Sequence, residues 1–384
     1  MILKICKKTI IFDLMKALFV GDASNLHNCL AQELRKMGHE AVVASNGSMW
    51  MRTGRDINLF RGRGAWGAVC YLARLLKALP LMRGYDVVHI AGHIFLTLKP
   101  EKVQRVFDYL KKHNGKIVLS ALNTDYYYFK ACHDGHTFRY SDYMVGDEPS
   151  PYVNSPEYEA QCQQNWTKPF MRRHAEHILE NVDGAVACLL EYYMTYKPLL
   201  GDRVIYADIP IDTQAIEPHF IAKEPEKVRF FIGIQRDRTV VKGTDRLLDA
   251  LRRVAARYPD ECEVVAVENL PYYDYLSRMR NSHVLVDQLY SYTPATNALL
   301  GMAHGLVAVS GAEPEYYELI GEKENRPIVN VSPLIADDID AQLSWLIEHK
   351  SQLPAMSRAS RAFVEKHNAA HLVASRYVEF WNSL

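Results

Sequence analysis

The residues best suited to chemistry lie in a cationic loop, GIQRDRTVVKG, at residues 233–243. The loop follows the apolar run 228–232 and precedes TDRLLDALRRVAARY, in which apolar residues recur at helical spacing. Arg236 and Lys242 are thus predicted between a strand end and a helix start, where backbone N–H groups and the helix dipole favour an anion. Arginine can donate hydrogen bonds to two phosphate oxygens at once, and lysine adds a compact positive charge. Gly243 would let the backbone approach a bound phosphate closely. The pair suits a diphosphate, and a solvated basic turn is the alternative.

A second stretch predicts another anion site at the same edge. Its sequence is LYSYTPATNALLGMAHGLVAVSGAEPEYYELI, residues 289–320, and its Pro294 is tolerated near the start of a helix. The first N–H groups of such a helix have no partner within it, and they should point to the same edge as Arg236. These groups belong to Thr296, Asn297 and Ala298.

Acidic residues near these stretches could accept hydrogen bonds or hold a metal. Glu313 and Glu315 follow the strand in HGLVAVSG and could accept hydrogen bonds from sugar hydroxyls, with helix capping as the alternative for Glu315. Asp338 and Asp340 have a spacing that can hold a divalent metal, but they open a helix whose N-terminus favours acidic residues. We therefore predict no metal site.

The elements that must position these residues alternate between strands and helices in both halves of the chain. Short apolar strands are predicted at 16–21, 40–45, 85–92, 116–122, 228–234, 262–268, 283–288 and 306–310. Amphipathic helices are predicted at 25–38, 69–79, 100–113, 244–258, 272–280 and 295–304. This alternation predicts an α/β fold of two Rossmann-like, doubly wound domains, each with a parallel sheet covered on both faces. Such domains bind ligands where strand ends meet helix starts, so both stretches should face a cleft.

Breaks in the alternation predict the domain boundaries. The proline-containing segment 208–227 has little periodicity and is typical of a connection between domains. We therefore predict a first domain at 15–207, a second domain at 208–365 and a terminal helix at 366–384. The tyrosine-rich stretch 123–166 has no clear period, and it predicts either a substrate lid or a surface insertion.

Composition limits the classes of function. A chain of 384 residues exceeds what one ordinary core supports, which favours two domains. Hydrophobic residues at 48% and charged residues at 23% are typical of soluble globular proteins. The formal net charge of zero argues against broad electrostatic capture of nucleic acid. The seven cysteines are scattered without a Cys-x-x-Cys pair, which favours a reducing cytoplasm over a disulfide framework.

Two apolar segments bear on location. Residues 1–14, MILKICKKTIIFDL, resemble a short signal, but Asp13 interrupts the apolar run, so we predict an upstream extension or tail and no export. We expect no membrane span, which needs about 18 apolar residues. The segment 61–84, RGRGAWGAVCYLARLLKALPLMRG, could dock on a membrane surface, and packing against the sheet is the alternative. The expected location is the cytoplasm, with the inner face of a membrane as the alternative.

Three runs of sequence resemble the carboxyl-terminal half of retaining, nucleotide-sugar-dependent glycosyltransferases of the GT-B fold, the large family-four group. They are GIQRDRTVVKGTDRLLDAL, ALLGMAHGLVAVSGAEPEYYELI and FVEKHNAAHLVASRYVEFW. The first half of the chain is similar in architecture and in ALFVGDASNLHNCLAQELRKMGHE. The resemblance implies transfer of a sugar from a nucleotide diphosphate to a glycan or lipid-linked acceptor, in polysaccharide or glycan synthesis. It also implies that the helix 366–384 returns to the first domain, and that no cofactor is needed beyond the nucleotide-sugar co-substrate.

The resemblance implies roles for the residues of the donor site. Arg236 and Lys242 would neutralise the donor diphosphate beside Gly243. Thr296, Asn297 and Ala298 would hold phosphate as well. Transfer would proceed with retention at the anomeric carbon by front-face attack, so the resemblance implies no fixed nucleophile and no metal.

The resemblance also implies roles near the sugar and the acceptor. Glu313, and also Glu315, would contact the donor sugar. Gly21 and Asp22, in the loop after the first strand, would approach the diphosphate or the acceptor from the first domain. Asn123 and Asp125 could act on the acceptor side, and turn formation is the alternative for both residues.

One departure from the family pattern puts activity in doubt. The family has two glutamates eight residues apart, of which the second binds ribose, and these positions are Tyr292 and Leu300 here. Leu300 cannot accept a hydrogen bond from a hydroxyl, so Glu268 or Asn269 at a strand end could replace that contact. The alternatives are a catalytically silent nucleotide-sugar-binding or scaffold protein, which Leu300 favours, and a nucleotide-sugar epimerase.

Overall fold

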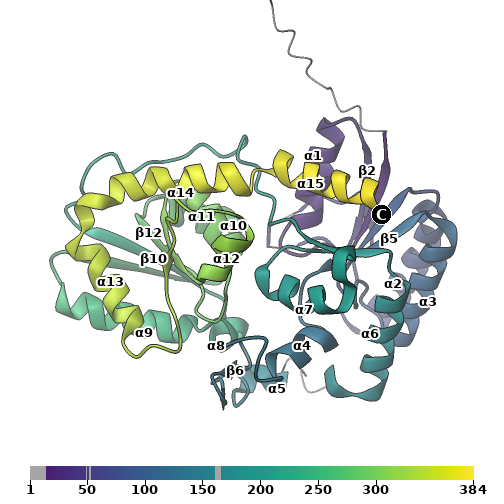
Figure 1. Cartoon of the computed structure of the whole chain (residues 1–384), viewed down its shortest axis with the longest axis horizontal. Coiled ribbons are helices and arrows are strands. Elements are labelled where there is room, and N and C mark those ends of the chain that lie inside the picture. The colour runs from purple at the N-terminus through teal and green to yellow at the C-terminus, as the bar shows by residue number, and fades with distance from the viewer. Residues whose placement is uncertain (1–13, 49, 52, 161–165) are drawn as a thin grey trace, which may run out of the picture.

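The computed structural model describes residues 14–48, 50–51, 53–160 and 166–384. Within these residues the chain forms two α/β domains, each with a parallel sheet between helices (Figure 1). The predicted fold class is therefore confirmed. Of the predicted extension at 1–14, only Leu14 belongs to the described residues.

The first domain is built on a parallel sheet that has seven strands among the described residues. Across the sheet they are β3 (Ile57–Asn58), β2 (Glu40–Ser45), β1 (Lys16–Val20), β4 (Val87–Ala91), β5 (Lys116–Ala121), β8 (Gly184–Ala187) and β9 (Val204–Tyr206). The helices are α1 (Leu26–Lys36), α2 (Gly64–Ala78), α3 (Pro100–His113), α6 (Pro169–Asn181) and α7 (Leu190–Leu200), with 3-10 turns η1 (Leu79–Met82) and η3 (Gly201–Arg203). Because helices cover both faces, every residue of β4 is buried.

The second domain repeats the arrangement on a smaller sheet. Its described strands are, in order, β11 (Cys262–Glu268), β10 (Val228–Ile234), β12 (Val284–Val286), β13 (Val307–Ser310) and β14 (Val329–Asn330). The helices are α8 (Thr239–Lys242), α9 (Thr244–Arg257), α10 (Tyr272–Arg280), α11 (Thr296–Ala303), α12 (Pro314–Leu319), α13 (Asp338–Glu348) and α14 (Leu353–His367), with 3-10 turns η4 (Arg236–Arg238) and η5 (Lys350–Gln352). All neighbouring strands pair in parallel, so their carboxyl ends share one edge.

A segment after β5, residues 123–160, forms what we call the strap. It contains α4 (Tyr126–Cys132), the short hairpin β6 (Met144–Val145) and β7 (Glu148–Pro149), and α5 (Pro156–Ala160). The strap has its own apolar cluster, in which Tyr128, Tyr143 and Tyr152 are buried and pack with Val240 and Val241 of α8. Buried tyrosines therefore stabilise this stretch, although its sequence has no regular apolar period, and their packing on α8 joins the strap to the second domain.

The last helix, α15 (Ala370–Ser383), leaves the second domain and lies against the first, near α1 (Figure 1). Trp381 is buried there, and its indole Nε1 donates a hydrogen bond to Nε2 of His89 in β4 at 2.7 Å. Arg376 donates to the buried carboxylate of Asp208, in the connection between the domains, at 2.8 Å. The carboxyl terminus thus completes the core of the domain in which the chain begins.

Helix α2 is unusual because much of its apolar surface is exposed. The span Gly64–Met82 has 19 residues and a mean hydropathy of 1.2, which is enough by length and composition to cross a membrane. This finding corrects the expectation that no segment would qualify. The helix nevertheless packs on the first domain through Tyr71, Leu75 and Met82, each at most 2% exposed.

Candidate active-site cleft

A cleft of about 300 Å³ opens between the two domains, at the carboxyl ends of both sheets. Asn123 and Glu191 line it from the first domain, and Arg238, Lys242 and Asp287 line it from the second. The cleft lies where two facing doubly wound domains are expected to bind a ligand.

The cationic loop folds into the turn η4 and the short helix α8, and one of the two cations that it presents to the cleft differs from the prediction. Arg236 is largely exposed and forms an ion pair with Glu268 on the edge strand β11. Neither of these residues lines the cleft, and neither does Asn269. Arg238, two residues along, lines the cleft together with Lys242. The structure therefore gives Arg238 the position expected for Arg236, and it does not bring Glu268 or Asn269 to Leu300.

Lys242 sits at the end of α8 inside the cleft wall. Burial lowers the pKa of its ammonium group, and the negative charge of Asp287 offsets part of that effect. The next residue, Gly243, has a φ of 67°, and a Cβ there would lie 2.8 Å from Cβ of Leu289. Glycine therefore lets α8 turn into α9 while Lys242 stays close to the loop that leads to α11.

The start of α11 provides backbone donors at the same place. The helix begins at Thr296, one residue after the predicted start at 295, and its cap residue Ala295 makes no side-chain capping bond. The first N–H with a partner inside the helix belongs to Leu299, which donates to Ala295 O at 3.1 Å. Thr296 and Asn297 line the cleft, whereas Ala298 has a fully buried side chain. The positive end of the helix dipole thus faces the same space as Lys242.

A hydrogen-bonded carboxylate that the sequence reasoning missed also lines this wall. Asp287 Oδ1 accepts a hydrogen bond from Asn297 Nδ2 at 2.9 Å, and Tyr275 Oη donates to Asn297 Oδ1 at 2.7 Å. Asp287 Oδ2 is buried and has no hydrogen-bond partner among the described residues. Leu300 also lines the cleft. The position of Asp287 at the end of the predicted strand 283–288 was the available signal.

The two glutamates expected at the donor sugar are instead held by the strap. Arg139 donates to Glu313 Oε2 at 2.6 Å and also forms an ion pair with Glu315. Tyr140 Oη donates to Glu313 Oε1 at 2.7 Å, and its ring stacks on Tyr292 with centroids 4.7 Å apart. Both oxygens of Glu313 are therefore occupied, which corrects its assignment as a free acceptor for sugar hydroxyls. Glu315 lies in the first turn of α12, whose cap residue is Glu313.

A second contact of the strap reaches the cationic loop. The carboxylate of Glu157 accepts hydrogen bonds from the backbone N–H groups of Val240 at 2.8 Å and Val241 at 3.1 Å. From the first domain, Glu191 accepts hydrogen bonds from Tyr292 N and Thr293 Oγ1, both at 2.7 Å. Arg139 and Glu157 of the strap and Glu191 of the first domain therefore all bind to segments that form the donor side of the cleft.

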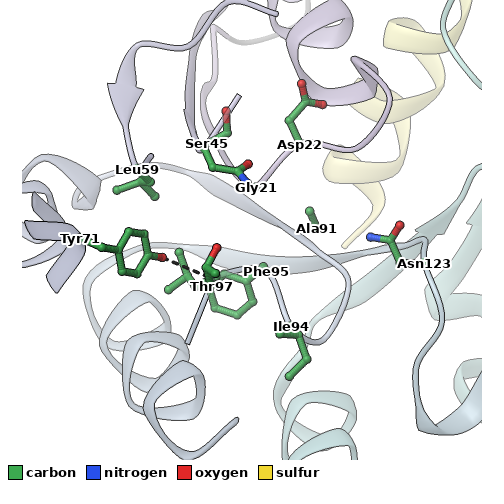
Figure 2. A pocket seen from close by; sticks show the side chains of 12 residues that line it. Gly21, Asp22, Ser45, Leu59, Tyr71, Ala91, Ile94, Phe95, Thr97 and Asn123 are labelled. Carbon is green, nitrogen blue, oxygen red and sulfur yellow. Dashed lines mark hydrogen bonds between the residues drawn. The ribbon is translucent and has the colours of Figure 1, made fainter. Parts of the chain in front are cut away.

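The acceptor-side residues surround a pocket of about 310 Å³ in the first domain (Figure 2). Gly21 and Asp22 follow β1, and Asn123 follows β5 with its amide extended beside Ala91 (Figure 2). Gly21 has a φ of 85°, and a Cβ there would lie 2.7 Å from Cβ of Ala91. Asn123 also lines the main cleft, so the pocket and the cleft meet at this residue.

Asp22 is a buried carboxylate with one free oxygen. Its Oδ1 accepts a hydrogen bond from His27 N at 2.9 Å, and its Oδ2 has no partner among the described residues. Burial raises the pKa of Asp22 from an ordinary value near 3.8 to about 6, against the opposing effect of the backbone hydrogen bond from His27. The carboxyl group can therefore exchange a proton near neutral pH.

Asp125 has a structural role, which corrects its assignment to the acceptor side. Its Oδ1 caps α4 by accepting hydrogen bonds from Tyr127 N at 2.8 Å and Tyr128 N at 2.9 Å, and its Oδ2 accepts one from Tyr196. Asp340 likewise forms ion pairs with two arginines, Arg253 at 2.6 Å and Arg257 at 3.1 Å. No cluster of three metal-binding side chains occurs in the part of the chain that the structure describes.

Known structures resemble the whole chain, although no family model matches the sequence and a search of curated proteins found no relative. HepE of Anabaena, in complex with UDP and glucose, has a TM-score of 0.58 at 12% identity, over 96% of this chain and 100% of that one. Sucrose-phosphate synthase of Thermosynechococcus elongatus has a TM-score of 0.58 at 11% identity, over 96% and 98%. MnaA of S. aureus, bound to UDP, has a TM-score of 0.51 at 12% identity, over 95% of both chains. At these identities the likeness establishes the two-domain GT-B fold.

Proposed function

We propose that the protein is a glycosyltransferase that moves a sugar from a UDP-sugar to a glycan or lipid-linked acceptor in polysaccharide or glycan synthesis. The observation that carries this proposal is the meeting of Lys242, Arg238 and the uncapped start of α11 at one side of the cleft. Solved proteins of the same fold bind UDP and UDP-glucose, which supports UDP as the leaving group.

The donor diphosphate would lie between the cations and the helix start. As the bond from the anomeric carbon to the phosphate oxygen breaks, negative charge builds up on the diphosphate, and Lys242 and Arg238 stabilise it. A bound diphosphate would favour the charged form of Lys242, whose pKa burial lowers. Asp287 is placed to accept a hydrogen bond from a donor hydroxyl, the contact that Leu300 cannot make.

The acceptor would enter from the first domain, where Asp22 and Asn123 are available to orient its hydroxyl group. We propose transfer with retention and without a metal, as the family resemblance implies. The acceptor oxygen forms its bond to the anomeric carbon on the face that the diphosphate leaves, and the hydroxyl proton passes to the departing phosphate oxygen. Asp22 would hold the hydroxyl by accepting its hydrogen bond in the ground state.

A nucleotide-sugar-binding protein without activity is the second candidate. Leu300 favours this candidate because it cannot make the ribose contact that the resemblance implies. The ion pair of Arg139 with Glu313 favours it as well, because it occupies the carboxylate that the resemblance assigns to the donor sugar. This candidate predicts binding of a UDP-sugar without its consumption, and it therefore differs from the first in a measurable way.

Calorimetric titration with UDP and UDP-sugars, followed by a donor-consumption assay, tests both candidates. A variant with Arg238→Ala and Lys242→Ala should bind UDP about 100-fold more weakly, since it loses two charge-assisted contacts. Arg236→Ala is the matched control, because Arg236 lies in the same loop and should leave affinity unchanged. Equal losses in the variant and the control would contradict the assigned site. Binding with no turnover on any acceptor would favour the inactive protein.

A further inference from the structure

Helix α2 exposes apolar side chains along the side that faces away from the core. Trp66 is 77% exposed, Val69 57% and Leu76 60%, and Leu72 lies on the same side. Their spacing of three and four residues places them on one stripe, opposite the stripe that Tyr71 and Leu75 bury. Packing against the sheet accounts for the buried stripe only, so the exposed stripe needs another explanation.

Exposed cations surround this apolar stripe. They are Arg61, Arg63, Arg74, Lys77, Arg83, Lys99 and Lys102. Among the described residues none of them takes part in an ion pair, although Arg74 donates a hydrogen bond to Phe60 O at 2.6 Å. The chain as a whole has a formal net charge of zero, so this side carries a local surplus of positive charge. The complementary partner is an anionic surface with an apolar interior.

A cavity beside α2 extends the apolar stripe into the domain. It has a volume of about 670 Å³ and lies between α2 and the segment that joins β4 to α3. Its walls are mostly apolar, with Val69 and Leu72 on one side and Leu96 and Leu98 on the other. Arg61, Lys99 and Lys102 also line it. An apolar chain with a negatively charged head group fits these walls.

The cavity adjoins the acceptor pocket, with which it shares part of its lining. Tyr71, Ile94, Leu96 and Thr97 line both spaces. Figure 2 shows Tyr71 and Thr97 on the side of the pocket away from Asn123. Tyr71 Oη accepts a hydrogen bond from Thr97 N at 3.2 Å, which holds α2 to this wall. The exposed stripe of α2, the cavity, the acceptor pocket and the cleft are thus neighbours along one side of the first domain, and each shares lining residues or side chains with the next.

We propose that α2 docks the protein on an anionic lipid bilayer, and that the adjoining cavity takes the lipid part of a phosphate-bearing, lipid-linked acceptor. The helix lies in the plane of the membrane surface, with Trp66 and Leu76 in the interface and the surrounding cations on the anionic head groups. It does not cross the bilayer, because Tyr71 and Leu75 belong to the core of the first domain. The role of the cavity rests on the proposed glycosyl transfer, whereas docking does not.

Vesicle flotation of the full chain tests docking. We expect binding to vesicles of phosphatidylcholine with phosphatidylglycerol, and weaker binding to phosphatidylcholine alone or at high salt. Joint substitution of Trp66→Ser, Val69→Ser and Leu76→Ser should weaken binding at least about tenfold, because it removes the buried apolar contacts. Leu334→Ser with Ile335→Ser is the matched control, since these exposed residues belong to the second domain.

Failure of the wild type to bind anionic vesicles would overturn the proposal, and so would equal binding by the triple variant. Self-association that the triple variant abolishes, without vesicle binding, would assign the stripe to a second copy of the chain and would also overturn it. Calorimetric titration with UDP separates this proposal from the proposed function, because the triple variant should keep UDP affinity. Acceptor use is read by comparing a lipid-linked sugar with the same sugar as a soluble glycoside. The variant should lose the preference for the lipid-linked form.

Discussion

Replacement of Asp22 by asparagine should stabilise the protein at neutral pH while impairing its function. Asparagine keeps the shape of the side chain and an oxygen that accepts the hydrogen bond from His27 N. It lacks the negative charge that burial makes unfavourable. We therefore expect Asp22→Asn to raise the free energy of unfolding and to lower the rate of sugar transfer.

The size of the effect follows from the pKa of Asp22, which burial raises from 3.8 to about 6. Each pKa unit is worth about 1.4 kcal/mol, so the ionised carboxylate costs the folded state up to about 3 kcal/mol at pH 7. The folded state holds the proton more tightly than the unfolded chain does. The contribution of protonated Asp22 to the free energy of unfolding is thus fully present below about pH 4, and it is lost as the pH rises through about 6.

Urea denaturation of both proteins across pH 4 to pH 8 is the assay. The variant should match the wild type near pH 4 and exceed it by about 2 to 3 kcal/mol above pH 6. Asp202→Asn is the control, because the side chain of Asp202 is fully exposed. A difference between wild type and variant that stays constant across this pH range would refute the reasoning, since it could not arise from titration of Asp22.

Two further changes test the contacts that join the domains. Trp381→Ala should lower the free energy of unfolding by about 3 to 5 kcal/mol, because it removes a buried indole and its hydrogen bond to His89, and a loss below 1 kcal/mol in urea denaturation would contradict this. Arg139→Met should release the strap from Glu313 at a cost of about 1 kcal/mol, since Arg139 is half exposed, and should speed proteolytic cleavage of the strap. Lys130→Met within the strap is the control. An unchanged rate of cleavage in Arg139→Met would contradict the idea that Arg139 holds the strap to Glu313.

Local pattern was sufficient to predict the architecture and one wall of the site. Short apolar strands in alternation with amphipathic helices require covered parallel sheets, and these bring strand ends and helix starts to one edge. The start of α11 at Thr296 follows from the same pattern. Lys242 lies at this edge of the sheet, between the strand and the helix that the pattern predicts on either side of the loop.

The errors come from contacts between residues distant in sequence. Arg236 and Arg238 are two residues apart in a turn, and only the folded neighbours decide which of them faces Glu268 and which the cleft. Apolar residues do not recur at regular spacing in the strap, so the sequence did not predict its contact with Glu313. Asp125 illustrates the opposite case, because the stated alternative was a local structural role, turn formation, and the role that the structure shows is also local, the capping of α4.

The return of α15 to the first domain also sets the order in which the protein can be completed during synthesis. His89 lies in a central strand of that domain, but its partner Trp381 lies in α15, 292 residues later in the chain. The first domain emerges from the ribosome long before the helix that covers it. Until α15 has been made, the surface around Phe19 and His89 stays uncovered, and a transiently exposed apolar surface of this kind favours aggregation.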